Sequence, residues 1–437
     1  MSKQLDKKLS LYGLTMIAIG SVIGAGIFGT PTEVLEVLPH QGWTLAVWAL
    51  GGLVALCGAL TFAELGGLFP KSGGVYVYLR NAYGDLVGFL YGWVILLVVN
   101  TGALAALSLI FARYVSQLIP GLTESMHLPI GIFIIVVLTA INAIGINTTQ
   151  RLASLFTSLK LIALLGIIIM AWVYYAPATV DLNLSLGTNK PDNLISAIFL
   201  ALIGVQFSFG GWHHASYLSG ETINAQRTVP RAMIIGTIIV TIFYMLINLA
   251  YMQLLPMEEM LATKAIASDA LGNFSNGKMI AAIIVSISVC GTIGIYTVSA
   301  PRIYFAMAAD GLFFKQLAYV HPKWKTPVVA MFVQAALAII LLLFFKTFSN
   351  LISYVTFIDV IFMTLAGISI FIFRKKMPDA ERPYRTVLYP IVPLLFILIS
   401  SAFIVNTLIE KPVQALAGLG LVVVGVLIYF YFKGQKV

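Results

Sequence analysis

Long apolar stretches fill most of this 437-residue chain, and they constrain its fold more than any other feature. Hydrophobic residues make up 60% of the sequence and charged residues only 10%, whereas ordinary soluble proteins have about 25% charged residues. About 20 apolar residues in a helix cross the roughly 30 Å hydrocarbon core of a bilayer. We therefore predict an all-α polytopic membrane protein with twelve transmembrane helices. The predicted spans lie near residues 11–37, 43–68, 84–119, 129–146, 152–176, 193–220, 231–255, 277–308, 327–346, 351–373, 388–408 and 412–432.

Lysine and arginine residues orient these spans. Most of the 26 cationic residues fall in alternate connecting segments, including the basic N-terminus and the cluster Arg374-Lys375-Lys376. Because cytoplasmic loops collect Lys and Arg, we expect the N- and C-termini to be cytoplasmic in a multi-pass protein of the cell (plasma) membrane. The net charge of +9 then follows from topology. Nucleic-acid binding is not expected, since it would need a contiguous basic face.

Several other classes of protein are disfavoured by what the sequence lacks. The first apolar stretch is longer than a signal-peptide core, so we expect it to be retained as a helix. Cys57 and Cys290 fall inside spans and are expected to be buried apolar side chains rather than a disulfide. Walker loops, metal-ligand spacings and nucleophile motifs are absent from the sequence, which predicts a non-enzyme without metal or cofactor.

Two predicted spans are interrupted by glycines near their middle. The interruptions are Ile23-Gly24-Ala25-Gly26-Ile27-Phe28 in the first span and Phe207-Ser208-Phe209-Gly210-Gly211-Trp212 in the sixth. Glycine weakens a helix interior by about 1 kcal/mol, and unwound backbone at bilayer depth is tolerated only where it lines a protein cavity. Broken helices in corresponding positions of two halves indicate a transporter with a central substrate site. The breaks lie five spans apart, which predicts a 5+5 inverted repeat.

This repeat would organise one transmembrane domain over residues 1–437. We expect the two repeats at about 11–176 and 193–373, with additional helices at about 388–432. Residues 256–273 form the largest predicted extracellular connection. Its helix-forming composition fits either a lid over the site or a surface helix.

The unwound turns offer backbone groups that suit a zwitterion. Free N–H groups at Gly24, Ala25 and Gly26 begin a half-helix and can hold a carboxylate without any cationic side chain. Carbonyls freed at both breaks can accept the hydrogens of an α-amino group. An alternative is that the glycines only allow close helix packing. The candidate acceptor residues are Ile19, Val22, Phe207 and Ser208.

Several short motifs follow one another in a specific order. They are Gly20-Ser-Val-Ile-Gly-Ala-Gly-Ile-Phe28, Phe62-Ala-Glu-Leu-Gly-Gly-Leu-Phe-Pro-Lys-Ser-Gly-Gly-Val-Tyr-Val-Tyr78, Phe207-Ser-Phe-Gly-Gly-Trp212, Ser219-Gly-Glu-Thr-Ile-Asn224 and the segment from Pro301-Arg302 to Thr326-Pro327. In this order they resemble the amino acid, polyamine and organocation (APC) superfamily, most closely bacterial relatives of its L-type amino acid transporter branch. The resemblance covers nearly the whole chain. It implies a LeuT-like fold with helices 1 and 6 unwound in the middle, alternating access and amino acid transport.

The resemblance also assigns roles to single residues. Phe207 aligns with the aromatic gate, and Gly210 with the position beneath the substrate side chain. A lysine on span 5 of the resembling family takes the place of the sodium ion of sodium-coupled relatives, which gives this role to Lys160. Lys160 lies near the middle of its span, where a cation must face the protein interior. We therefore predict sodium-independent transport, and proton coupling through Lys160 is also conceivable. The alternative to an interior position is that the Lys160 side chain snorkels to the interface. The complete candidate substrate site is Ile19, Val22, Ile23, Gly24, Ala25, Gly26, Phe207, Ser208 and Gly210.

Other polar residues leave two interpretations open. Glu64, Arg80, Glu221 and Arg302 lie near the predicted cytoplasmic ends, where they would latch an inner gate or form structural ion pairs. His213, His214 and Asp359 fit either a proton role or ordinary interior pairing. Asn100 would reach the pocket or hold neighbouring helices together.

The expected substrate is a neutral amino acid, because the pocket positions on spans 1 and 6 contribute no charged side chain. The expected mechanism is proton symport or exchange. Alternatives are a cationic amino acid or polyamine antiporter, a non-transporting membrane amino acid sensor, and an ion channel. Eukaryotic L-type transporters bond to a glycoprotein subunit through a cysteine between spans 3 and 4. That loop here lacks cysteine, so no disulfide-linked heavy subunit is expected.

Overall fold

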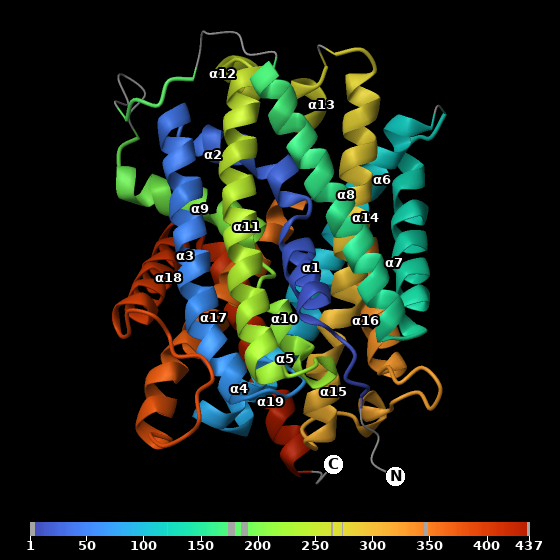
Figure 1. Ribbon diagram of the computed structural model, residues 1–437, viewed down its shortest axis with the longest axis vertical. Helices are drawn as coiled ribbons and strands as arrows, with labels where there is room; N and C mark the ends of the chain where they lie inside the picture. Colours follow the sequence, from blue (N-terminus) through green and yellow to red (C-terminus); the bar gives the residue numbers. More distant parts are fainter. Residues whose placement is uncertain are drawn as a thin grey trace.

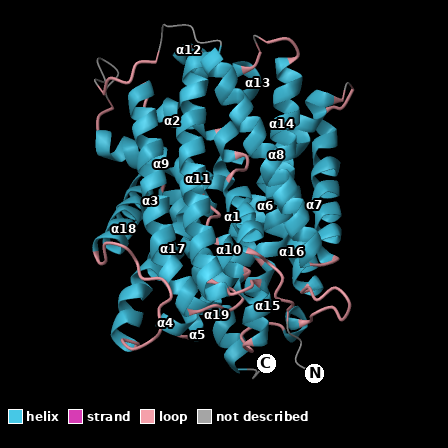
Figure 2. Ribbon diagram, in the orientation of Figure 1, coloured by secondary structure: helices cyan, strands magenta, loops and turns pink. Residues whose placement is uncertain are grey.

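The computed structural model describes residues 5–119, 121–173, 180–184, 191–263, 265–272, 274–344 and 348–434. The described chain folds into long helices that run between two ends of one bundle (Figures 1 and 2). The α-helices are α1 (Leu11–Val22), α2 (Thr30–Val37), α3 (Gln41–Leu68), α4 (Val75–Tyr83), α5 (Asp85–Val94), α6 (Asn100–Leu118), α7 (His127–Ala143), α8 (Ile146–Val173), α9 (Leu194–Phe209), α10 (His214–Tyr217), α11 (Ala225–Leu254), α12 (Met257–Ala262), α13 (Ile266–Ala270), α14 (Gly277–Ser299), α15 (Pro301–Ala309), α16 (Val328–Phe344), α17 (Phe348–Lys376), α18 (Ile391–Glu410) and α19 (Pro412–Gly434). The 3₁₀ turns are η1 (Gly26–Phe28), η3 (Glu124–Met126), η4 (Ser219–Glu221) and η5 (Lys315–Ala318), and η2 (Ile95–Val99) is a π-helical turn.

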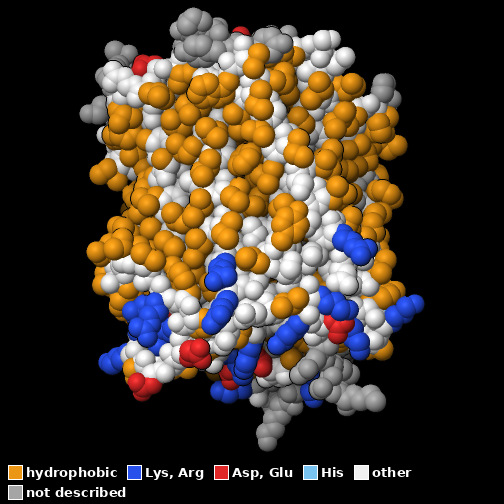
Figure 3. Space-filling model, in the orientation of Figure 1, with side chains coloured by type: hydrophobic (Ala, Val, Ile, Leu, Met, Phe, Trp, Pro, Cys, Tyr) orange, Lys and Arg blue, Asp and Glu red, His pale blue; other side chains and the backbone are white. Residues whose placement is uncertain are grey.

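The helices have the length and composition of membrane spans. Among the described residues, nine helical segments are long and apolar enough to cross a bilayer, and α1, α9 and α16 are shorter apolar helices. Hydrophobic side chains cover the upper two thirds of the surface in Figure 3, and Lys and Arg side chains gather at the lower end. The protein is therefore a multi-pass membrane protein.

Helix ends differ from the predicted ones in a few places. The fourth span ends at Ala143 and the fifth begins at Ile146, although the sequence-based limits were 146 and 152. Gly145 separates the two helices with a φ of 145°, a left-handed conformation that favours glycine. The seventh span begins earlier than predicted, at Ala225. The predicted span ends near 176 and 346 lie outside the described residues.

Both glycine-containing spans are interrupted where the sequence indicated. Ser10 caps α1 by accepting a hydrogen bond from the Gly13 amide, and α1 ends at Val22, with the following α-helix starting at Thr30. In the sixth span α9 ends at Phe209 and α10 begins at His214. Each interruption therefore leaves several residues of non-α-helical backbone inside the bundle.

The interruptions of the first and sixth spans lie inside the bundle, where nearly all of their residues are buried. Helix α1 contacts α8, α11 and α14, and α9 contacts α2, α3 and α17 (Figure 1). At the periphery, α18 and α19 carry exposed leucines and valines, as expected for lipid-facing helices. The unwound segments are thereby shielded from the membrane by other helices.

The connection after α11 is neither disordered nor a single surface helix. It contains α12, which contacts α2, and α13, which contacts α11 and α14. Met260 and Ile266 are buried in these contacts. Helices α12 and α13 thus lie at the end of the bundle shown at the top of Figure 1, opposite the end where Lys and Arg side chains gather in Figure 3.

Candidate substrate-binding site

The two interruptions pack directly against each other. The Ser21 hydroxyl donates to the Gly211 carbonyl at 2.8 Å, and the Thr30 and Ser208 hydroxyls are 2.7 Å apart. A Cβ at Gly26 would lie 2.8 Å from the Ser208 Cα atom, so only glycine fits there without displacing the sixth span. The two breaks are therefore in direct contact in this conformation. In this conformation Gly26 therefore allows the two broken spans to pack closely, as the alternative interpretation expected.

Tyr244 of α11 joins the two breaks through its hydroxyl group. The phenolic oxygen lies 2.9 Å from the Val22 carbonyl oxygen and 3.0 Å from that of Ser208. The other candidate acceptors also have partners, since Ile19 accepts from the Ile23 amide and Phe207 from the Gly210 amide. A carbonyl oxygen has two lone pairs, so each retains acceptor capacity for a ligand.

The backbone N–H groups of the first break differ from these carbonyls, because they have no hydrogen-bond partner. Gly24, Ala25 and Gly26 are buried, and their N–H groups make no hydrogen bond within the described part of the chain. Buried N–H groups without a partner are rare because they cost free energy. This turn consequently presents unused donors at the start of η1.

Lys160 is fully buried beside the first break. Its ammonium group donates to the carbonyl oxygens of Gly20 at 2.9 Å and Ile23 at 2.6 Å, and to the Thr292 hydroxyl at 2.9 Å. Three donors therefore meet three acceptors, which is the full capacity of an ammonium group. The contacts tie α8 to the end of α1 and to α14. The snorkelling alternative does not agree with this geometry.

A cavity of about 70 Å³ lies beside the break of the sixth span. Phe207 and Gly210 line it, together with side chains from η2, α6, α14, α17 and α18. The other candidate residues, from Ile19 to Gly26 and Ser208, do not line it, because the two breaks are closed on one another. The polar lining residues are Asn100, Gln206, His213, His214, Tyr217, Tyr296, Thr356, Asp359 and Ser400.

Comparison with known proteins places the chain in a family. The model of the amino acid permease family matches residues 9–431. The chain belongs to the amino acid permease family. Its relatives include the serine/threonine exchanger SteT of Bacillus subtilis, 33% identical over 99% of this chain and 98% of that protein. The human large neutral amino acids transporter small subunit 2 is 33% identical over 98% of this chain and 80% of its own length, and the human cystine/glutamate transporter is 32% identical over 98% and 86%.

Two features around the cavity and the breaks of the permease were not predicted from the sequence, namely the turn η2 and the contacts of Tyr244 and Thr292. The π-helical turn η2 brings Ile95 and Val99 to the cavity wall, and π turns often mark functional sites. The contacts of Tyr244 and Thr292 could not be predicted, because a tyrosine or threonine in an apolar span is common. Asn100 both lines the cavity and donates to the Tyr296 carbonyl at 3.4 Å.

The two histidines and the aspartate also lie at the cavity of the permease. His214 Nδ1 is 2.8 Å from the Ser299 hydroxyl, and its ring contacts that of Tyr296. His213 packs its ring against Trp212 and Tyr217. The Oδ1 atom of Asp359 is buried and has no hydrogen-bond partner among the described residues.

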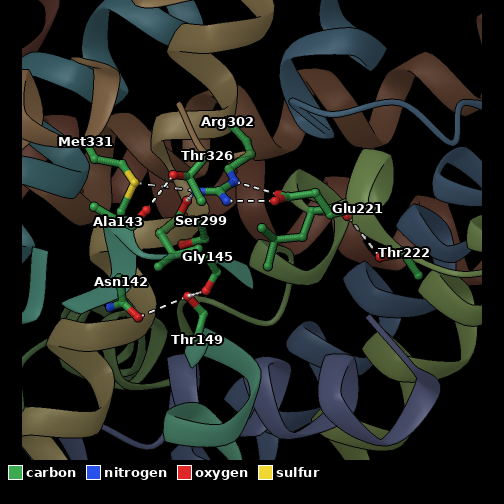
Figure 4. A network of polar contacts seen from close by, with 12 residues as sticks. Asn142, Ala143, Gly145, Thr149, Glu221, Thr222, Ser299, Arg302, Thr326 and Met331 are labelled. Carbon is green, nitrogen blue, oxygen red and sulfur yellow. Dashed lines mark hydrogen bonds and ion pairs between the residues drawn. The ribbon is translucent and has the colours of Figure 1, made fainter. Parts of the chain in front are cut away.

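Ion pairs join the helices at the basic end of the permease. Arg302 and Glu221 are fully buried and form a two-point pair, with N–O distances of 2.7 and 2.9 Å (Figure 4). Glu64 does not pair with Arg80; it binds Arg374 and Arg382. Arg80 instead lies 2.6 Å from Asp310.

The N-terminal segment of the permease is tied to the same region. The amides of Lys8 and Leu9 donate to the Glu221 carbonyl, and the Ile223 amide donates to that of Leu9. The segment before α1 is therefore attached to the backbone that follows the sixth span.

Proposed function

We propose that this permease is a sodium-independent secondary transporter that exchanges amino acids across the plasma membrane by alternating access. The observation that carries the proposal is the position of Lys160. Its ammonium group occupies a site formed by two carbonyls at the end of the first half-helix and a hydroxyl on α14. A fixed ammonium can bind the same oxygen atoms that would coordinate a sodium ion.

The proposed substrate contacts lie between the two breaks. The unpartnered N–H groups from Gly24 to Gly26 are suited to the α-carboxylate, since they combine free donors with a helix N-terminus. The remaining lone pairs of Val22 and Ser208 are suited to the α-amino group. Binding there would require the two breaks to move apart, with Tyr244 as the group that holds them together in the described conformation. Phe207, which lines the cavity, is proposed as the gate.

The proposed architecture is a LeuT-like single domain of twelve helices with a 5+5 inverted repeat. It is supported by interruptions in the first and sixth apolar segments, five segments apart. The gathering of Lys and Arg at one end supports a cytoplasmic location for that end.

We further propose that the permease works without a disulfide-linked heavy subunit. Cys57 lies within α3 and Cys290 within α14, and neither is in a disulfide. Both lie inside helices, away from an extracellular loop.

Exchange can be tested with purified permease in proteoliposomes. A panel of labelled amino acids is presented with and without unlabelled amino acid inside, in sodium and in choline buffers, with and without a proton gradient. We expect uptake to require internal amino acid and to be equal in the two buffers. Strict sodium dependence would contradict the role of Lys160. Accumulation driven by a proton gradient in empty vesicles would identify a symporter, and saturable binding without flux would identify a sensor.

A further inference from the structure

We propose that Asp359 determines substrate selectivity and that the cavity accepts amino acids with a short, positively charged side chain. This inference rests on the proposed transport function, because it names the substrate class of the same site. It adds a cation-recognising carboxylate that the two helix breaks do not supply.

Among the described residues that line the cavity, Asp359 is the only lysine, arginine, aspartate or glutamate. It lies on α17, a helix that also contacts α9 next to the break. Its Oδ1 atom is buried without a hydrogen-bond partner in the described part of the chain. A carboxylate at this depth therefore has acceptor capacity that no described side chain uses.

The two fully buried cations among the described residues, Lys160 and Arg302, are bound to other groups. The three donors of Lys160 are used by Gly20, Ile23 and Thr292, and the Arg302 guanidinium is bound to Glu221. Asp359 forms no ion pair with any described lysine or arginine. Burying an unpaired charge costs several kcal/mol, so a charged Asp359 needs a cation from outside the protein.

The rest of the cavity wall suits an ammonium group on a short chain. Rings of Phe207, Trp212, Tyr217 and Tyr296 line the same cavity as Asp359. Aromatic faces attract cations, and they do so more strongly when water is excluded. Aromatic rings together with one carboxylate form a recognised type of environment for ammonium ligands.

The size of the cavity favours a short substrate side chain. The cavity measures about 70 Å³ with the two breaks closed on one another, and a cavity that holds one water needs about 10–15 Å³. The proposed contacts of the α-carboxylate and α-amino group lie between the breaks, so the cavity beside Asp359 has to take only the side chain of the substrate. We therefore expect 2,4-diaminobutyrate and ornithine to fit better than longer basic amino acids.

This substrate class differs from the neutral one expected from the sequence. That expectation considered spans 1 and 6, which contribute no charged side chain to the pocket. The tenth span contributes Asp359, and its position in the cavity favours the cationic alternative.

The test is competition against a transported label in proteoliposomes, using matched pairs of competitors. Ornithine is compared with norvaline, and 2,4-diaminobutyrate with 2-aminobutyrate, so that each pair differs by one amino group. We expect the basic member to compete at least tenfold better in the wild type. In Asp359→Asn this preference should disappear while the uncharged members still compete. Glu33→Gln is the matched control, because Glu33 lies on α2 outside the cavity lining, and it should keep the preference.

Each other outcome has a definite meaning. Equal or weaker competition by the basic members in the wild type overturns the selectivity proposal, and this comparison holds even if Asp359→Asn fails to fold. A wild type that transports only uncharged amino acids with protons, and a variant that loses proton-driven accumulation, would make Asp359 a proton carrier and overturn the proposal. A wild type that neither transports nor binds any amino acid contradicts the proposed function itself.

Discussion

Lys160 makes the contacts that we propose take the place of a bound ion. Its contacts are two backbone carbonyls and one hydroxyl, with no carboxylate among the described residues. Such a group is neutralised by dipoles rather than by a counter-ion. The first half-helix is thereby fixed to α8 and α14 by a charge that belongs to the chain.

Replacing this side chain should damage transport. Hydrogen bonds to charged groups contribute about 1.5–3 kcal/mol each, so losing even one contact predicts an exchange rate at least about tenfold lower in Lys160→Ala. The measurement is exchange in proteoliposomes, with the exposed Lys71→Ala as the matched control. Wild-type exchange in Lys160→Ala would remove this residue from the mechanism. Partial recovery of the variant in sodium buffer would show that the vacated oxygen atoms can bind an ion.

The sequence predicted the interior position of some residues but not their contacts. Lys160 was predictable as an interior group because a cation in the middle of an apolar span has few places to go. Its three partners were not, since they depend on how three helices meet. Asp359 was equally visible as a charge, but only the packing of α17 against α9 places it at the cavity.

At the scale of helices, two kinds of ion pair join the helix ends at the basic end of the bundle. Glu221 and Arg302 are fully buried, whereas the side chains of Arg80 and Asp310 are 31% and 37% exposed. Buried pairs are costly to break because the remaining charge stays without a partner, and exposed pairs contribute little. The two pairs therefore allow the contribution of a buried ion pair to stability to be compared with that of an exposed one.

Glu221→Gln should destabilise the permease strongly. We expect a loss of about 3–5 kcal/mol, because Arg302 would remain buried without its carboxylate. The double variant Glu221→Leu/Arg302→Leu should be more stable than the single one, and Asp310→Asn should cost about 0–1 kcal/mol. Thermal unfolding in detergent orders the four proteins. Equal stability of Glu221→Gln and Asp310→Asn would contradict the expectation that the buried pair stabilises the permease more than the exposed pair.

Helix boundaries were predictable where composition changes sharply and less so elsewhere. The interruption between α1 and α2 follows from its glycines, and both ends of that span match the predicted 11–37. The boundary at Gly145 was misplaced because α8 begins with the polar run Asn147-Thr-Thr-Gln-Arg151, whose composition is typical of a loop. The π-helical turn η2 has no recognisable sequence pattern, since it consists of ordinary branched aliphatic residues.

At the scale of the whole molecule, the distribution of charge defines two ends. Lys and Arg side chains gather at the end where the chain begins and finishes, and α12 covers the other end (Figures 1 and 3). The sequence predicted this asymmetry well, because charge counts in loops do not depend on the details of packing. It could not predict which conformation of the transport cycle the helices adopt.

The proposed orientation can be measured by cysteine labelling. Cys57 and Cys290 are first replaced by alanine, and a single cysteine is introduced at the exposed Lys376 or the exposed Glu258. A membrane-impermeant maleimide should label Glu258→Cys in intact cells and Lys376→Cys only after permeabilisation. The reverse pattern would place the termini outside.

The covalent attachment of the Lys160 charge to α8 has an energetic consequence for the cell. A sodium ion enters and leaves with each cycle and brings the energy of its gradient, but the Lys160 charge remains attached to α8 whichever side is open. A sodium gradient can therefore do no work through that position. An exchanger built in this way follows the concentration ratios of the amino acids themselves, so its net direction is set by metabolism on the two sides of the membrane.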